Sequence, residues 1–263
     1  MRFFLAAISF AVIFSLAGCN RPQSRGLTIE DGLLSVGIEI GYPPMEYYDV
    51  DGVTPVGFDI DLIKALAEKL GLQAKYIDVA WEGILAGLDS GRYDIAVNIT
   101  ILPERQRRYN FTKPYIDSSM TIVTLKNFPV KIEKPQDIAG KRVSFQGDTT
   151  AQYFTEGLSG LGIKFSSFGY DKIINCFNDL KFGRVDLVVV DSIAAFEYAG
   201  RENGNFEIAW NGPSDEYIGI CLKKGNDALT AALDNALDEL FADGTMLEIS
   251  QKFFKRDLVS PLW

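Results

Sequence analysis

The segment DIAVNIT, residues 94–100, is a short apolar run that ends just before the sequence PER at 103–105. A second run, DLVVVD, occupies residues 186–191. Each run follows Gly-Arg and one further residue, tyrosine in the first case and valine in the second. Neither run alternates between polar and apolar residues, which is typical of strands that helices cover on both faces. Arg105 follows the first run and Asp191 ends the second. The sequence therefore predicts two similar buried strands with opposite charges near their carboxyl ends.

Helical and strand patterns alternate on either side of these runs. In GFDIDLIKALAEKLG (57–71) apolar residues recur at three- and four-residue spacing, so we expect a helix that Asp59 caps and Gly71 ends. Such alternation predicts an α/β fold with largely parallel sheets. Because the unit of helix, Gly-Arg and buried strand occurs twice, the sequence predicts two lobes.

Two extended segments, residues 113–127 and 212–226, predict that the chain crosses twice between the lobes. The helical patterns that follow the second crossing are expected to pack back on the first lobe. We assign residues 33–115 and 219–263 to the first lobe and residues 120–213 to the second.

The N-terminus has the pattern of an export signal. Arg2 precedes an apolar run that is shorter than the roughly 20 residues a membrane span requires. The sequence Leu-Ala-Gly-Cys at 16–19 resembles the bacterial lipobox, which implies cleavage before Cys19 and lipid attachment to its sulfur. Residues 1–18 are then a lipoprotein signal peptide and residues 19–32 a tether; the alternative is a true membrane anchor.

Composition excludes several kinds of function. The formal net charge is −9, whereas nucleic-acid binding needs a basic face, so we expect no nucleic-acid partner. The chain has no histidine, which removes histidine-based triads and histidine metal sites, and we expect no cofactor or metal. Cys176 and Cys221 are candidates for pairing in an exported protein, but a bridge would restrain motion between the lobes, so we expect both to be free.

The ends of the two buried strands indicate where a ligand binds. Ligands of open α/β sheets lie beyond the carboxyl ends of the strands. Arg105 presents a planar fork that suits a carboxylate, and Asp191 can accept hydrogen bonds from an ammonium group. If the lobes face each other, these residues together suit a zwitterion.

Four segments in this order resemble the bacterial family 3 extracellular solute-binding proteins. They are GYPPMEYYD…GFDIDLIKALAEKLG, GRYDIAVNITILPERQRRYNFTKPY, VSFQGDTTAQY and GRVDLVVVDS. The resemblance covers nearly the whole chain after Cys19. It implies a type II periplasmic-binding-protein fold, in which two α/β lobes are joined by two hinge segments. It also implies an amino-acid receptor of an ABC importer.

The resemblance implies a role for each matching position in binding the amino-acid backbone of a ligand. Arg105 and Thr100 would hold the α-carboxylate, together with hydroxyl and N–H groups of Thr149 and Thr150 at a helix start. Asp191 would take the α-ammonium group.

The resemblance places other positions around the ligand side chain. Glu39, Tyr42 and Trp81 match positions that line this part of the pocket. The segment from Asp94 to Arg105 is one residue shorter than is usual, and Asn98 stands where a small residue usually offers its carbonyl to the ammonium group.

Each of these residues also has a plain structural interpretation. Arg105 is alternatively a solvated loop residue, and Asp191 and the two threonines are alternatively helix caps. Tyr42 and Trp81 are alternatively core aromatics, and Glu39 is alternatively paired with a lysine or arginine.

The sequence predicts a monomeric, lipid-anchored binding protein on the periplasmic or extracellular face of the cell membrane. It would capture a polar or cationic amino acid and deliver it to an ABC permease in the inner membrane. One alternative is a sensor module that binds ligand without transport. Another is an enzyme similar to cyclohexadienyl dehydratase, in which Glu39 or Asp191 handles protons.

We predict that Cys19 carries lipid. Wild-type protein should be recovered from the membrane fraction, and Cys19→Ala should be released into the soluble fraction or remain unprocessed. Fractionation with mass spectrometry of the N-terminal peptide checks this. A wholly soluble wild type without acyl mass on residue 19 would contradict it.

Overall fold

The computed structural model describes residues 26–200 and 204–262. The predicted signal peptide and Cys19 lie outside these residues. Among the residues described, no helix is both long enough and apolar enough to cross a membrane.

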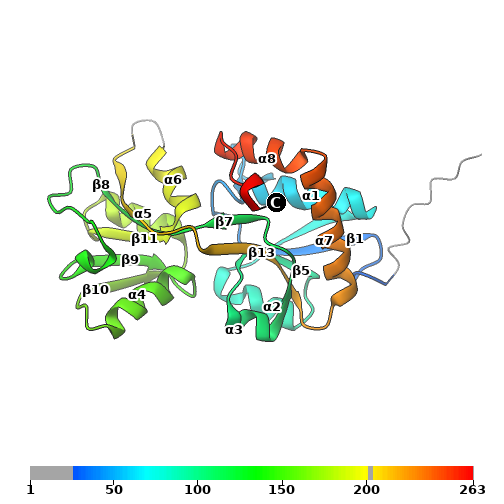
Figure 1. Ribbon diagram of the computed structural model, residues 1–263, viewed down its shortest axis with the longest axis horizontal. Coiled ribbons are helices and arrows are strands. Elements are labelled where there is room, and N and C mark those ends of the chain that lie inside the picture. Colours follow the sequence, from blue (N-terminus) through cyan, green and yellow to red (C-terminus); the bar gives the residue numbers. More distant parts are fainter. Residues whose placement is uncertain (1–25, 201–203, 263) are drawn as a thin grey trace, which may run out of the picture.

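The chain forms two α/β lobes joined by two crossing segments, as the sequence predicts (Figure 1). The first sheet has the order β4-β1-β5-β13-β6, with β7 paired to β13, and the second has the order β10-β9-β11-β8-β12. The strands of the first sheet are β1 (Leu33–Ile38), β4 (Gln73–Asp78), β5 (Ile95–Thr100), β6 (Tyr109–Phe111), β7 (Ile116–Ser118) and β13 (Glu216–Lys223). Those of the second are β8 (Met120–Leu125), β9 (Arg142–Gln146), β10 (Ser166–Tyr170), β11 (Leu187–Asp191) and β12 (Phe206–Asn211), and β2 (Tyr47–Tyr48) pairs with β3 (Pro55–Val56) as a separate hairpin.

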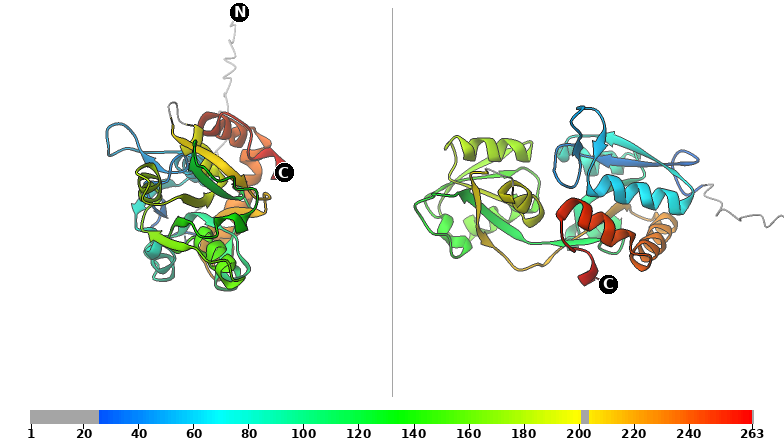
Figure 2. Two further views of the ribbon diagram at one scale, coloured as in Figure 1. Left: turned by 90° about the vertical axis from the view of Figure 1, so that its left-hand side faces the viewer. Right: turned by 90° about the horizontal axis from the view of Figure 1, so that it is seen from above.

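Helices surround both sheets, and in the right-hand view of Figure 2 the two lobes lie side by side. The first lobe carries α1 (Phe58–Leu70), α2 (Ile84–Asp89), α3 (Pro103–Arg108), α7 (Asp227–Ala242) and α8 (Thr245–Phe254). The second carries α4 (Thr150–Gly160), α5 (Ile173–Lys181) and α6 (Ser192–Gly200). Short 3₁₀ turns occupy Trp81–Gly83, Pro135–Ile138 and Ser260–Leu262.

The sheets are mixed, whereas the sequence analysis expected largely parallel ones. β1 pairs in parallel with β4 and β5, and β9 pairs in parallel with β10 and β11. The crossing segments then add antiparallel strands, because β13 pairs with β5 and β8 pairs with β11. Each crossing therefore enters a sheet directly beside the strand whose end faces the other lobe.

The two opening runs are buried on both faces, as predicted. In β11, Leu187 and Val189 pack into one apolar cluster, whereas Val188 and Val190 pack into another on the opposite face. β5 is likewise divided between two clusters. Such strands are held rigidly, so the residues at their ends have fixed positions.

The predicted role of Asp59 as a cap is wrong. The carbonyl oxygens of Pro44 and Met45 accept hydrogen bonds from the first N–H groups of α1, those of Phe58 and Asp59, so these donors need no side-chain cap. The Asp59 side chain is fully buried instead. Gly71 ends the helix in the left-handed conformation, as expected.

The two internal cysteines are free and buried, as predicted. Cys176 lies on α5 in the second lobe and Cys221 on β13 in the sheet of the first.

We predict that Gly87→Ala destabilises the first lobe. A Cβ atom at Gly87 would lie 2.2 Å from the hydroxyl oxygen of Tyr93, whose rigid ring is 1% exposed. Overpacking of this kind typically costs about 1–3 kcal/mol. Gly83→Ala is the matched control, since a Cβ there has nothing within 4 Å and alanine favours helical backbone. Denaturant unfolding of both variants decides the point, and equal stabilities would contradict it.

Candidate functional site

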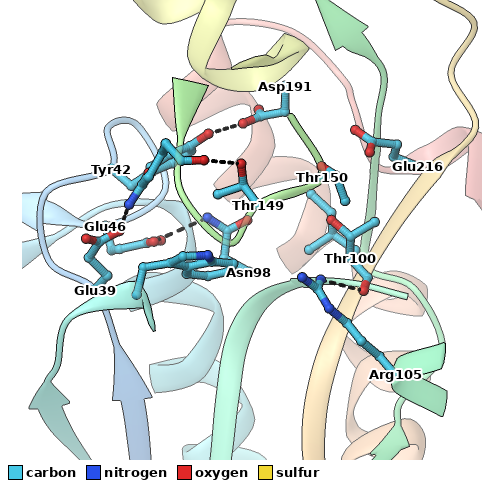
Figure 3. A pocket seen from close by; sticks show the side chains of 13 residues that line it. Glu39, Tyr42, Glu46, Asn98, Thr100, Arg105, Thr149, Thr150, Asp191 and Glu216 are labelled. Atoms are coloured by element: carbon cyan, nitrogen blue, oxygen red, sulfur yellow. Dashed lines mark hydrogen bonds between the residues drawn. The ribbon is translucent and has the colours of Figure 1, made fainter. Parts of the chain in front are cut away.

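A pocket of about 490 Å³ lies between the lobes and is lined by all nine residues that the sequence analysis selected (Figure 3). These are Glu39, Tyr42, Trp81, Asn98, Thr100, Arg105, Thr149, Thr150 and Asp191. The sequence analysis missed four further lining residues, Glu46, Gln146, Glu216 and Ile218.

Arg105 is a buried cation at one end of the pocket. It lies on the short helix α3, which begins at Pro103 directly after β5, and it is only 7% exposed. One guanidinium nitrogen, Nη1, donates to the Thr100 carbonyl oxygen at 3.1 Å. Within the described part of the chain no carboxylate forms an ion pair with it. A buried charge is costly without a partner, so donors remain available here for an anion.

Asp191 both caps a helix and faces the pocket. Its Oδ1 accepts from the N–H groups of Ile193 and Ala194 at 2.9 and 3.0 Å, at the start of α6. Its Oδ2 accepts from the hydroxyl of Tyr42, which belongs to the first lobe. Burial raises the pKa of Asp191, and these three hydrogen bonds oppose the rise.

Thr149 and Thr150 stand at the start of α4. Thr149 occupies the cap position, but its hydroxyl donates to the Gln146 carbonyl oxygen at 2.7 Å and does not cap the helix. Thr150 is the first helical residue and lies near Glu216, whose pKa its side chain lowers. The N–H groups of this helix start carry partial positive charge at the pocket wall.

Asn98 interrupts β5 with a bulge. Its φ of 57° is left-handed, and the pairing of β5 with β13 shifts register next to it. As a result its side chain amide donates to Glu46 Oε1 at 3.2 Å, and its backbone N–H donates to the Tyr115 hydroxyl. The sequence analysis noted Asn98 where a small residue usually offers its carbonyl, and in the structure Asn98 lines the pocket.

Glu39 lies at the end of the pocket opposite Arg105 (Figure 3) and is 5% exposed. Its Oε2 accepts from Gln146 Nε2 at 2.7 Å, and its buried Oε1 has no hydrogen-bond partner among the residues described. Burial raises the pKa of Glu39, with Gln146 and the charge of Lys172 opposing the rise. The Oε1 atom of Glu39 is thus an acceptor available to a ligand donor.

Three hydrogen bonds join the lobes across the pocket. Besides the Tyr42–Asp191 and Gln146–Glu39 bonds, the indole Nε1 of Trp81 donates to the Asp148 carbonyl oxygen at 3.1 Å. Trp81 and Tyr42 are therefore interlobe contacts as well as partners of the apolar clusters. In all three bonds the acceptor is an oxygen atom, and the donors are an uncharged hydroxyl, amide and indole group.

Glu46 forms a buried carboxyl pair with Asp59 behind the pocket. The two residues are 3% and 0% exposed, and Glu46 Oε2 and both oxygens of Asp59 have no other partner within the described residues. Burial and the neighbouring Asp59 hold the pKa of Glu46 well above its usual range, and burial raises the pKa of Asp59 to about 7. A proton shared between the carboxyls would satisfy the unpartnered oxygens.

Two α/β lobes, two crossings and a polar interlobe pocket with a buried arginine define a bilobal solute-binding protein. The chain belongs to the bacterial extracellular solute-binding proteins, family 3, whose family model matches residues 34–256.

Relatives and solved structures agree with this assignment. The chain is 32% identical over 231 residues to the L-cystine-binding protein TcyJ of Escherichia coli K12, covering 87% of this chain and 85% of that protein. It is 30% identical over 227 residues to the ABC transporter arginine-binding protein 1 of the same organism, covering 84% and 90%. An ancestral arginine-binding protein bound to arginine has a similar structure, with a TM-score of 0.81, 34% identity and coverage of 85% of this chain and 98% of that one.

We predict that Glu46→Gln stabilises the protein more at pH 8 than at pH 5. A carboxyl whose pKa is raised by folding contributes stability below its unfolded pKa and loses it as pH rises through the folded value. For Asp59 the loss falls between its usual pKa and about 7, and for Glu46 it extends well above the usual range, so glutamine relieves a charge only at the higher pH.

The gain in melting temperature over wild type should be several degrees larger at pH 8, equivalent to about 1–2 kcal/mol. Thermal unfolding without ligand at both pH values measures it. Exposed Glu82 provides the control, because Glu82→Gln should give the same small change at each pH. An equal effect of Glu46→Gln at both pH values would count against the shared proton.

Proposed function

We propose that the protein is an extracytoplasmic, lipid-anchored receptor that captures an amino acid between its lobes and delivers it to an ABC permease. The observation that carries the proposal is the buried guanidinium of Arg105, which has no carboxylate partner within the described residues and lies beside Thr100 and Thr150. An α-carboxylate bound there would receive a bidentate, charge-assisted pair of hydrogen bonds. Asp191 lies in the same pocket and would accept from the α-ammonium group.

The proposed ligand has a cationic side chain. Four carboxyl groups line the pocket, from Glu39, Glu46, Asp191 and Glu216, against the single guanidinium of Arg105. The α-carboxylate and α-ammonium groups of a ligand cancel, so a neutral amino acid would leave this excess unchanged. A cation on the ligand side chain that reaches the Oε1 atom of Glu39 would offset the excess of carboxyl groups and give a buried acceptor a hydrogen-bond partner.

The relatives support an amino acid but differ in which one they bind. One is named for cystine, whose two carboxylates and two ammonium groups leave no net charge, and another for arginine. The excess of carboxyl groups in this pocket favours the second class. Stacking of a guanidinium on the rings of Tyr42 or Trp81 would add to the preference.

The proposal makes the chain a transport receptor and not an enzyme. One similar structure is an ancestral amino-acid-binding protein described as a precursor of cyclohexadienyl dehydratase, with a TM-score of 0.79 and 30% identity. Incubation with prephenate-like acids separates these functions, since the proposal predicts no turnover. A permease that co-purifies with the membrane-bound receptor separates transport from sensing.

The ligand itself is found by a thermal-shift screen of the twenty amino acids, with keto acids and polyamines added. Arginine and lysine should give the largest shifts and leucine and valine the smallest. A preference for leucine or valine would contradict a cationic side chain while leaving amino-acid binding intact.

We predict that Arg105→Ala weakens binding of this ligand about 100-fold to several thousand-fold. Removing one partner of a buried ion pair typically costs about 3–5 kcal/mol. Arg105→Lys should also bind poorly, because lysine keeps the charge but not the two-pronged geometry. Isothermal titration of the folded variants measures the loss.

Arg107→Ala is the matched control, since Arg107 lies on the same helix but is exposed, and it should bind like wild type. Asp191→Asn should weaken binding of the amino acid but spare its keto-acid analogue, which lacks the ammonium group. If folded Arg105→Ala binds within threefold of wild type, the carboxylate site has been assigned to the wrong strand end.

A further inference from the structure

Glu216 is a carboxyl group at the hinge that faces the predicted carboxylate site. It begins β13, the strand that enters the first sheet from the second crossing (Figure 1). Ile218, two residues further on, pairs with Thr100, and both Glu216 and Ile218 line the pocket. Because side chains two apart on a strand share a face, Glu216 lies on the pocket side of the hinge. Figure 3 shows it above Arg105 and Thr100.

The charges around Glu216 are mostly negative. The side chain of Thr150 lies near its carboxyl, and the charges that act on it come from Asp191 on β11, Arg105 on α3 and the adjacent Asp215. The neighbouring strand β7 contributes Asp117, which pairs in register with Tyr217 and accepts from the Ser214 hydroxyl. Glu216 is thus a half-buried acid with one cation and several anions near it.

A bound α-carboxylate would create a conflict at this position. The ligand oxygens would be held by Arg105 and by groups of Thr150, and Glu216 lines the same part of the pocket. Two carboxylates that share an enclosed site cannot both remain ionised without strong repulsion. If one of them holds a proton, the repulsion becomes a hydrogen bond between an acid and a carboxylate.

We propose that Glu216 is a further binding residue, which holds a proton in the occupied pocket and donates it in a hydrogen bond to the ligand carboxylate. Capture of an amino acid is then accompanied by uptake of one proton whenever Glu216 is ionised in the free protein. This inference rests on the proposed function, since it requires a carboxylate at Arg105. It makes Glu216 a determinant of specificity for ligands that carry a carboxylate.

The direction of the pH dependence follows from the free protein. Burial raises the pKa of Glu216 to about 7, with Thr150 and Arg105 opposing the rise. Below this pH the proton is already present and binding needs no uptake. Above it the proton must be taken from solvent, so affinity falls about tenfold per pH unit. Between pH 6 and pH 8.5 the expected loss is about 30-fold.

Isothermal titration of full-length mature protein with the amino acid from the screen tests the inference. Wild type at pH 8 should take up about one proton per ligand, as measured in two buffers of different ionisation enthalpy. Glu216→Gln keeps the shape and a hydrogen-bond donor without a titrating group, so its affinity should stay near the acidic wild-type value at every pH. Its proton uptake should be lower than that of wild type by about one.

Two controls separate Glu216 from the other acids of the pocket. Asp215 is exposed and adjacent, so Asp215→Asn should keep the wild-type pH dependence. The decarboxylated amine of the same ligand should bind wild type without the extra proton uptake, because it brings no carboxylate to Arg105. Equal proton uptake by wild type and Glu216→Gln, or a wild-type affinity that is flat from pH 6 to 8.5, would overturn the inference. Failure of wild type to bind any amino acid at any pH would overturn the proposed function instead.

Discussion

The guanidinium of Arg105 is the constraint around which the pocket is arranged. A charge that is only 7% exposed and has no carboxylate partner among the described residues is unfavourable unless the surrounding structure fixes it in place and an anion binds to it. The fixed position comes from β5, which is packed on both faces and ends at Thr100, and from Pro103, which starts a helix three residues later. The Thr100 carbonyl holds one guanidinium nitrogen and leaves the others toward the pocket.

Acidic side chains of the pocket, unlike Arg105, accept hydrogen bonds from neighbouring side chains or backbone N–H groups. Three of them are held by uncharged donors: Glu39 by Gln146, Glu46 by Asn98, and Asp191 by Tyr42 and backbone N–H groups. Uncharged donors satisfy lone pairs without cancelling charge. The pocket therefore offers several acceptor oxygens to a ligand cation, and exclusion of water on closure would strengthen their attraction for it.

Most of the fold and much of the site could be predicted because they follow from local patterns. The strand-end rule selected Arg105 and Asp191, and family resemblance supplied the other residues; all of them line the pocket. Glu46 and Gln146 were missed because no periodicity reports which loop or strand-end side chain turns inward. Asp59 was assigned to a cap because the pattern at a helix start does not reveal that carbonyls of Pro44 and Met45 already satisfy the N–H groups. Burial of that carboxyl beside Glu46 is a tertiary effect, as is the bulge at Asn98.

Glu216 was missed for a reason that also bears on how the protein works. In the sequence it is a polar residue at the start of an extended crossing, where an exposed acid is the ordinary expectation. In the structure the same strand is both a connection between the lobes and a wall of the pocket, since Glu216 and Ile218 line it while the strand pairs with β7 and β5. In the proposed receptor, a ligand that contacts this wall would act directly on a segment that connects the lobes. Closure requires only that ligand contacts differ between the open and closed arrangements. Such a ligand could contact the hinge strand, Arg105 of the first lobe and Asp191 of the second at once only when the lobes meet. Ligand recognition and closure would then depend on the same few side chains.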